Sequence, residues 1–288
     1  MSTTRTNLAS EALEKSVEVR EEHDYDFRSP LCVYELCGRA RIKVQFVDDV
    51  SMEGVYAALA KPTILLSALR PLSRRAFTCA HELGHHVFGH GSTIDELKED
   101  ADGAVFQPDE FLVDAFAGYL LMPPQAVKRA FSSRQLDQNT ATPEQMYTVA
   151  CAFGVGYETL IGHLQYSLKS LEASRADLLR KSKLPQIRER LLGSPSKDPL
   201  VIADRHHAIG TLDAEVGGLV LLPTGAVTDS DQIELVKELP SGTLYRALRA
   251  GLARVEVPGA NWGVVVRVSR FQYAGLAQYR HLEETSSD

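Results

Sequence analysis

The first half of the chain mixes short apolar stretches with polar segments, a pattern typical of interleaved strands and helices. Residues 42–47 and 63–66 have the alternating or short apolar character of half-buried strands. Helices are predicted for three segments: residues 31–38, 73–90 and 109–122. These segments begin at capping residues or end at glycine or proline. Residues 1–28 are polar and are expected to be helical or partly disordered, whereas the acidic residues 95–102 predict a solvated loop.

Further along, residues 143–164 predict two helices joined by a tight turn. Two interpretations are open for this helix-turn-helix-like pair: a DNA-binding element, or a helical extension packed on the preceding domain. Residues 156–159, which the second helix would offer to a groove, include no arginine or lysine for phosphate or guanine contacts. We therefore favour the helical extension.

The last third of the chain has a different character. Residues 169–192 predict a basic connecting helix, and the Gly-Ser-Pro-Ser segment 193–196 predicts a linker. Beyond it, residues 219–222 and 262–268 are typical of strands, and residues 244–252 predict a short helix. These boundaries predict three domains: residues 1–138, residues 139–192 as helix-turn-helix-like and connecting helices, and a β-rich domain over residues 197–288.

The composition is that of an ordinary globular protein of 288 residues, with 44% hydrophobic and 24% charged residues. The net charge of -7 argues against a surface coated by nucleic acid, but it allows a local basic patch. The four cysteines form no C-x-x-C pair, and the polar N-terminal residues contain no apolar core of a signal peptide. Because no later stretch is apolar enough to span a membrane, we expect a protein of the reducing cytoplasm.

The strongest chemical signal is the H-E-x-x-H motif formed by His81, Glu82 and His85 on the second predicted helix. Histidines four residues apart lie on one helical face, so both imidazoles can reach one metal ion. Zinc accepts imidazole nitrogen and carboxylate oxygen, and a catalytic zinc site keeps one position open for water. Glu82, beside the metal, can take a proton from the attacking water and pass it to the leaving amine.

The next predicted helix supplies a third ligand, Glu110, with Asp114 one turn further along the same face. We assign Glu110 to the metal and Asp114 to the free N–H of a ligating imidazole. The extended pattern H-E-x-x-H-x-x-G-x-x-H is excluded, because this sequence has neither the glycine nor the third histidine at those places. On a continuous helix His86 and His90 would point away from the metal-binding face, so we expect them at the surface or in a helix cap.

The segments FTCAHELGHH (residues 77–86) and FAGYLLMP (residues 116–123), together with Glu110, resemble the ImmA/IrrE family of metallopeptidases. The resemblance covers residues 30–165 and implies an α+β fold with a minimal thermolysin-like zincin core. It also implies zinc as the cofactor, with His81, His85 and Glu110 as ligands and Glu82 as the base. In this family the C-terminal domains resemble ligand-sensing modules, some of the GAF type.

The resemblance implies an activity as well. Family members are zinc-dependent endopeptidases that cleave helix-turn-helix (XRE-type) repressors, and so derepress DNA-damage, mobile-element or phage-defence genes. A groove beside residues 63–66 could bind an extended segment of such a substrate by strand addition.

A second hypothesis is a DNA-binding transcription regulator in which the zinc site is structural and not catalytic. Such a site would need no Glu82 and would be closed by a fourth protein ligand, which the sequence does not obviously supply. Cys32 or Cys37 could block the open position as an off-switch. Cys79 lies on nearly the opposite helical face from His81, and we expect it in the core.

The C-terminal domain interleaves aromatic and basic residues, six of which are candidate nucleic-acid contacts: Tyr245, Arg246, Arg249, Arg267, Arg270 and Tyr279. Aromatic rings stack on bases and guanidinium groups follow phosphates, so single-stranded DNA is a candidate activating signal, with a small molecule or a protein as alternatives. In the predicted helix Arg246 and Arg249 share a face, and strand alternation places Arg267 on an exposed face. Trp262 and Phe271 are expected to be buried.

Overall fold

The computed structural model describes the chain in three stretches: residues 2–96, 106–207 and 210–282. The chain separates into two compact units of two segments each: Met1–Lys128 with Gln272–Gln278, and Arg129–Phe271 with Tyr279–Asp288. Each unit contains both helices and strands, which confirms the predicted α+β fold class. The division into three domains remains a prediction.

A five-stranded sheet organises the first unit. Its strands lie in the order β12, β1, β3, β2, β4, with these bounds: β1 Lys43–Val47, β2 Met52–Ala57, β3 Thr63–Ser67, β4 Thr93–Glu96 and β12 Gly275–Leu276. β1 and β3 run parallel, and the other neighbouring strands pair antiparallel. The sheet is therefore completed at one edge by β12, which comes from the far end of the chain.

β1 and β3 match the strands predicted at residues 42–47 and 63–66, whereas the sequence pattern does not predict β2 and β4. β3 pairs with β1 on one side and with β2 on the other, so the predicted addition of a substrate segment beside this strand is wrong. The edge opposite β12 belongs to β4. In the acidic segment predicted as a loop, residues 95–96 belong to β4, and residues 97–102 lie outside the described residues.

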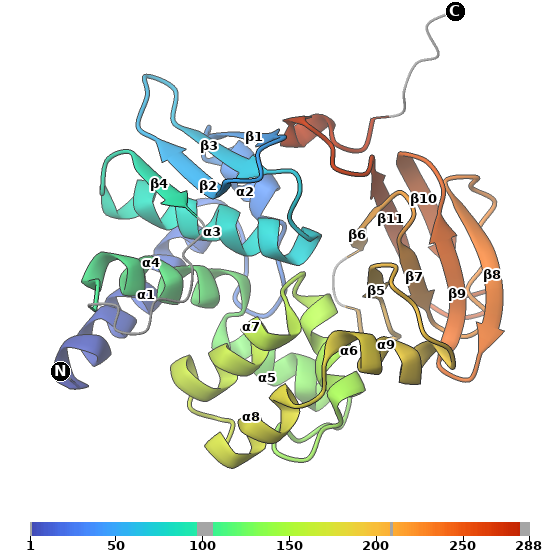
Figure 1. Ribbon diagram of the computed structural model, residues 1–288. Helices are drawn as coiled ribbons and strands as arrows, with labels where there is room; N and C mark the ends of the chain where they lie inside the picture. The colour runs from blue at the N-terminus through green and yellow to red at the C-terminus, as the bar shows by residue number, and fades with distance from the viewer. Residues whose placement is uncertain (1, 97–105, 208–209, 283–288) are drawn as a thin grey trace, which may run out of the picture. The chain divides into compact units, whose positions relative to one another are not determined.

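Among the described residues, the helices that lie wholly within the first unit are α1 Ser2–Glu22, α2 Val33–Arg39, α3 Leu72–Phe88 and α4 Pro108–Leu121. α3 packs across one face of the sheet against β2 and β3, and α4 lies beside both α3 and α1 (Figure 1). α3 ends at Phe88, before the predicted end at His90. Gly89 adopts the left-handed conformation, with φ 72°, and this conformation closes the helix.

α1 is held against α4 by one buried cation, Arg20, whose side chain is 1% exposed. Its guanidinium donates to the backbone carbonyl of Leu120 at 3.0 Å and to the carbonyls of Asp26 and Ser29. Burial lowers the pKa of Arg20 to about 10, which leaves the group protonated at neutral pH. Residues 1–28, expected to be helical or partly disordered, thus contain the helix α1, which is hydrogen-bonded to the C-terminal end of α4.

The second unit opens with helices, of which α5 crosses from the first unit: α5 Pro124–Ser133, α6 Pro143–Ala152, α7 Tyr157–Gly162, a π-helix His163–Ser167, α8 Ala173–Arg180 and α9 Leu184–Leu192. α6 and α7 pack together, as predicted for the helix-turn-helix-like pair. Thr142 and Gln145 form a capping box at the start of α6. The predicted single helix over 169–192 is two helices, because Pro185 is tolerated in the first turn of α9 but would disrupt a helix interior.

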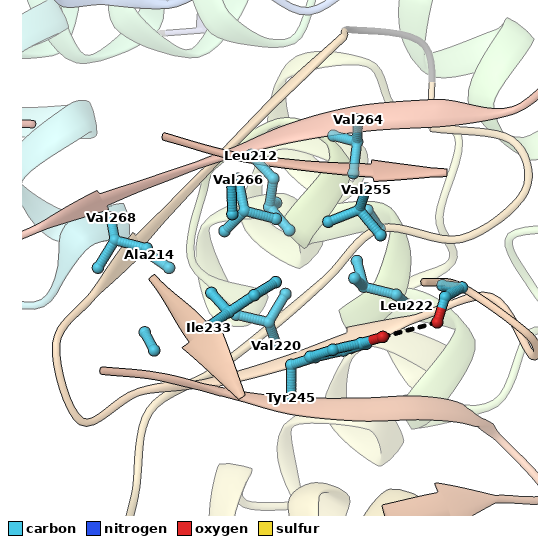
Figure 2. Close-up of a cluster of buried hydrophobic side chains, with 14 residues drawn as sticks. Leu212, Ala214, Val220, Leu222, Ile233, Tyr245, Val255, Val264, Val266 and Val268 are labelled. Carbon is cyan, nitrogen blue, oxygen red and sulfur yellow. Dashed lines mark hydrogen bonds between the residues drawn. The ribbon is translucent and has the colours of Figure 1, made fainter. Parts of the chain in front are cut away.

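Two sheets form the rest of the second unit. One has the order β5-β7-β9-β8 and the other β10-β11-β6, with these bounds: β5 Leu200–Ile202, β6 Thr211–Glu215, β7 Leu219–Leu222, β8 Ile233–Leu239, β9 Gly242–Ala247, β10 Gly251–Glu256 and β11 Gly263–Ser269. Both sheets contribute side chains to one buried core, which includes Val220, Leu222, Tyr245, Val264, Val266 and Val268 (Figure 2). The β-rich character agrees with the prediction, and a GAF-type module remains a prediction.

Residues 244–252 are not a helix as predicted, but the end of β9, a turn and the start of β10. β9 pairs with β7 and β8, while β10 pairs with β11 in the other sheet. Hydrogen bonds to neighbouring strands therefore satisfy this backbone, although its local pattern also suits a helix.

Candidate metal centre and active site

α3 brings His81 and His85 together on one face. Both side chains are buried, at 6% and 1% exposure, and their Nε2 atoms lie 3.2 Å apart. The two residues are one helical turn apart, so their rings point toward the same place. This is the arrangement that the H-E-x-x-H spacing predicts.

Glu110, in the first turn of α4, faces the same place from the neighbouring helix. Its Oε2 lies 3.6 Å from Nε2 of His81, and its Oε1 lies 3.7 Å from Nε2 of His85. α4 can approach α3 closely because Gly84 has no side chain. A Cβ at that position would lie 3.0 Å from Cβ of Val113 and 3.1 Å from Cδ1 of Phe116. Gly84 thus sets the separation of the two helices that carry the site.

The three side chains fit a single metal ion. One ligand atom from each lies within 4.8 Å of the others. In a tetrahedral zinc site with bonds of about 2.0–2.1 Å, neighbouring ligand atoms are separated by about 3.4 Å. The Nε2 atoms of His81 and His85 are 3.2 Å apart, close to this value. The two oxygens of the Glu110 carboxylate each lie 3.6–3.7 Å from one of these nitrogens, so the carboxylate is within reach of the same ion, and two imidazoles with one carboxylate leave a fourth position open.

Asp114 lies where the sequence assigns it, one turn beyond Glu110 on α4. Its Oδ1 is 2.8 Å from Nδ1 of His81. The carboxylate accepts the proton on Nδ1, so Nε2 of His81 keeps its lone pair toward the metal position.

Glu82 points to a different side of α3 from the ligand face, toward β2. It is fully buried, and a Cβ at Gly54 of β2 would come within 2.7 Å of its Oε1 and 2.5 Å of Cγ2 of Thr78. Only glycine therefore lets β2 run this close to the helix beside Glu82. The position of Gly54 gives no signal in the sequence, because this contact is made between distant segments.

The remaining two histidines of this region have partners that the helical pattern does not predict. Nδ1 of His86 lies 2.7 Å from the hydroxyl of Tyr56 on β2, and burial lowers the pKa of His86. The helical pattern places His90 at the surface or in a cap, pointing away from the metal-binding face. The cap is confirmed, because the backbone N–H of His90 donates to the carbonyl of His85 at 3.0 Å. The expected direction of the side chain is wrong, because Nδ1 of His90 lies 3.1 Å from Nδ1 of His85 on the metal-binding face. That expectation assumes a continuous helix, but the chain reverses at Gly89.

The cysteines take no part in the candidate metal group. Cys79 is buried, as predicted, and its Sγ lies 3.8 Å from Sγ of the equally buried Cys37. Burial raises the pKa of the Cys79 thiol, and the neighbouring Cys37 raises it further. Cys32 is partly exposed. The off-switch suggested for Cys32 or Cys37 remains a prediction.

Two of the six candidate nucleic-acid contacts belong to the interior of the second unit. Tyr245 is 4% exposed, and its hydroxyl donates to the backbone carbonyl of Ala226 at 2.7 Å (Figure 2). Arg267 is 9% exposed, and its guanidinium makes two bonds of 2.8 Å with the carboxylate of Asp213 on the adjacent strand. The exposed face predicted for Arg267 is wrong, and the Tyr245 ring is not exposed for stacking.

The other four candidates lie nearer the surface of the second unit. Arg246, on β9, pairs with Asp198 at 2.9 Å, and Arg249, in the turn after β9, pairs with Asp231. Because this segment is a strand and a turn, the two arginines do not share the helical face that was predicted. Tyr279 is 46% exposed, and Arg270 is partly buried.

The expectation that Trp262 and Phe271 are buried is half right. Trp262 packs against the core of the second unit. Phe271, however, is 61% exposed.

The buried histidine pair, the carboxylate on the neighbouring helix and the adjacent buried glutamate define a metallopeptidase-type site. Residues 37–164 match the family model Peptidase_M78, described as the IrrE N-terminal-like domain, and this range includes every residue of the site. This part of the chain is therefore an IrrE N-terminal-like domain of a peptidase family, which confirms the resemblance to the ImmA/IrrE family. No curated protein matches the chain. None of the helices in the described residues is both long and apolar enough to cross a membrane.

Proposed function

We propose that this protein is a zinc-dependent endopeptidase with Glu82 as its base. The observation that carries the proposal is the convergence of two Nε2 atoms and the Glu110 carboxylate, with one ligand atom of each residue within 4.8 Å of the others. Zinc is the metal that best suits two imidazoles, one carboxylate and an open fourth position. The peptidase-family match over the same region supports this chemistry.

The positions of the side chains support the following roles. His81, His85 and Glu110 would hold the ion, which when bound would polarise the scissile carbonyl. Glu82 would accept a proton from the attacking water and deliver it to the nitrogen of the leaving amine. The close contact of β2 at Gly54 would limit how far the Glu82 carboxylate can move. Asp114 would hold the ring of His81 in the tautomer that presents Nε2.

The substrate that we propose is a helix-turn-helix (XRE-type) transcriptional repressor, cut once or a few times. The resemblance to the ImmA/IrrE family supports this choice. An extended segment of the substrate would pair with β4, the edge strand that follows α3 in the chain. Cleavage would derepress stress, mobile-element or phage-defence genes.

We further propose that the C-terminal region gates the peptidase, with single-stranded DNA as the candidate signal. Arg246, Arg249 and Tyr279 remain accessible for this role. Asp198 and Asp231 already pair with the two arginines, so a phosphate would have to displace a carboxylate at each. Binding that depends on phosphate contacts should weaken as salt rises.

The function is tested with the purified protein and the repressor encoded beside its gene. The wild type should hold one zinc per chain and cleave the repressor. His81→Ala, His85→Ala and Glu110→Ala should each lose zinc, whereas Glu82→Gln should keep zinc and lose cleavage. Asp109→Ala is the matched control, because Asp109 is an exposed acid beside Glu110.

Three outcomes would contradict parts of the proposal. Full zinc in Glu110→Ala would reject the third ligand. Rapid digestion of casein with an intact repressor would reject the narrow specificity. Zinc binding by the wild type without cleavage, both with and without single-stranded DNA, would favour the alternative, a DNA-binding regulator with a structural zinc site.

The DNA signal is tested separately by fluorescence anisotropy with a labelled single-stranded oligonucleotide at low and moderate salt. The double variant Arg246→Glu/Arg249→Glu should bind more weakly than the wild type. Lys15→Glu, an exposed charge reversal on α1, is the control that should bind as the wild type does. Absence of binding by the wild type would remove DNA from the mechanism.

A further inference from the structure

His90 is brought back toward the metal-binding face by the way α3 ends. Gly89 is left-handed at φ 72°, and the backbone N–H of His90 donates to the carbonyl of His85 at 3.0 Å. A left-handed glycine followed by this bond is typical of a helix end at which the chain folds back over the last turn. The side chain of His90 then makes its own contact, with Nδ1 3.1 Å from Nδ1 of His85.

The His90 ring is also supported on its other side. It stacks on the ring of Phe88, with centroids 5.9 Å apart and planes 20° apart. Phe88 in turn packs edge-on against Phe116 of α4, with centroids 5.7 Å apart. The position of His90 is thus set both by the helix end and by the packing between the two helices that carry the metal ligands.

The proton positions follow from the geometry. Nε2 of His85 faces Nε2 of His81 and the carboxylate of Glu110, so it must keep its lone pair to bind a cation. Neutral His85 then carries its proton on Nδ1 and donates it across the 3.1 Å contact. His90 accepts this hydrogen bond on its own Nδ1, so its ring proton is on Nε2.

We propose that His90 is a positioning residue of the metal site, which holds His85 in the tautomer and ring orientation that present Nε2 to the ion. The proposal rests on the zinc site proposed above. His81 and His85 would then have different supports: the Asp114 carboxylate for the first, and a neutral imidazole for the second. Such hydrogen-bond partners raise ligand basicity and fix ring orientation.

A role in capping the helix alone is a competing explanation, and substitutions separate the two. The capping bond uses the backbone N–H of His90, which every residue except proline supplies. The bond to His85 needs a side-chain acceptor close to the position of Nδ1. Asparagine provides one in Oδ1, whereas alanine and leucine do not.

Zinc affinity, measured by competition with a chromophoric chelator, tests the proposal in the full-length protein. His90→Ala and His90→Leu should bind zinc about 10–100-fold more weakly than the wild type, and His90→Asn should recover most of the affinity. His86→Ala is the matched control, because His86 is a helical neighbour whose Nδ1 contacts Tyr56 instead of a ligand. It should keep wild-type zinc affinity. Thermal unfolding would show whether each variant is folded.

A second measurement does not depend on bound metal. NMR of the ring nitrogens in nitrogen-labelled apoprotein should show His85 with its proton on Nδ1 in the wild type and in His90→Asn, and mixed tautomers in His90→Ala. Wild-type affinity and an unchanged His85 tautomer in His90→Ala would overturn the proposal, as would His90→Asn behaving like His90→Leu. Failure of the wild type to bind zinc would reject the proposed zinc site, whereas the tautomer measurement would still decide whether His90 holds His85.

Discussion

Asp114 of α4 and His81 of α3 meet side chain to side chain, with 2.8 Å between Oδ1 and Nδ1, although they lie 33 positions apart in the sequence. The contact joins the helix that carries both histidine ligands to the helix that carries Glu110. A substitution of Asp114 should therefore change the affinity for the metal without removing a ligand.

Removal of the Asp114 carboxylate should weaken zinc binding by about 10–100-fold, because the ring of His81 would lose the acceptor that selects its tautomer. Asp114→Ala should show this loss by chelator competition, and Asp114→Asn should show a smaller one, since its amide oxygen can still accept. Asp109→Ala is the control, and it should bind zinc as the wild type does. Equal affinity in Asp114→Ala and the wild type would mean that Asp114 does not support the site.

Gly54→Ala should impair cleavage while zinc remains bound. The added Cβ would lie 2.5 Å from Cγ2 of Thr78 and 2.7 Å from Oε1 of Glu82, so β2 or the glutamate must move. Overpacking of this kind typically costs about 1–3 kcal/mol of unfolding free energy. Peptidase assays, zinc content and chemical denaturation would measure the three effects.

Gly38→Ala is the matched control for that substitution. Gly38 lies within α2, and an added methyl group there would meet no atom of the rest of the fold within 4 Å, apart from its own helix backbone. The protein should therefore become more stable or stay unchanged with alanine. Full peptidase activity in Gly54→Ala would show that the close approach of β2 has no part in positioning Glu82.

Arg20→Met should lower the free energy of unfolding by roughly 2–4 kcal/mol. The carbonyls of Leu120, Asp26 and Ser29 would lose the guanidinium that donates to them, and α1 would lose its bond to α4. Lys15→Met is the comparison, because Lys15 forms only an exposed pair with Glu18 and should change stability by less than about 1 kcal/mol. Urea denaturation followed by circular dichroism would distinguish the two.

Asp213 should make the stability of the second unit sensitive to acid. Burial by itself raises the pKa of Asp213, but His281, Arg280 and Arg267 outweigh it and hold the pKa well below its usual range. Because the folded pKa lies below the unfolded one, the carboxylate stabilises the fold above about pH 4, and this contribution is lost as the pH falls further. Asp213→Asn should cost roughly 2–4 kcal/mol at neutral pH and flatten the acid dependence.

The single tryptophan of the chain, Trp262, provides the measurement, because its indole N–H bonds to the carbonyl of Asp204 within the same unit. Its fluorescence can follow urea unfolding at neutral and at acid pH. Asp229→Asn, an exposed aspartate of this unit, should change stability by less than about 0.5 kcal/mol at both pH values. An acid dependence in Asp213→Asn as steep as in the wild type would contradict the assignment.

The sequence by itself determined the parts of the site that depend on helical spacing. His81 and His85 share a face because they are one turn apart, and Glu110 and Asp114 do so for the same reason. Strands and helices with clear local signals, such as β1 and α4, were predictable within a residue or two. These features need only the geometry of one element.

Tertiary structure decided the features that depend on a contact outside a single helix or strand. Arg267 is buried because strand pairing places it opposite Asp213, and residues 244–252 are extended because neighbouring strands take up their backbone hydrogen bonds. Gly54 matters only because β2 passes over Glu82. His90 reaches His85 because the helix ends at Phe88 and is closed by the left-handed Gly89, so His90 does not continue the helix. In each case the outcome depends on a contact outside one helix or strand, which local periodicity does not encode.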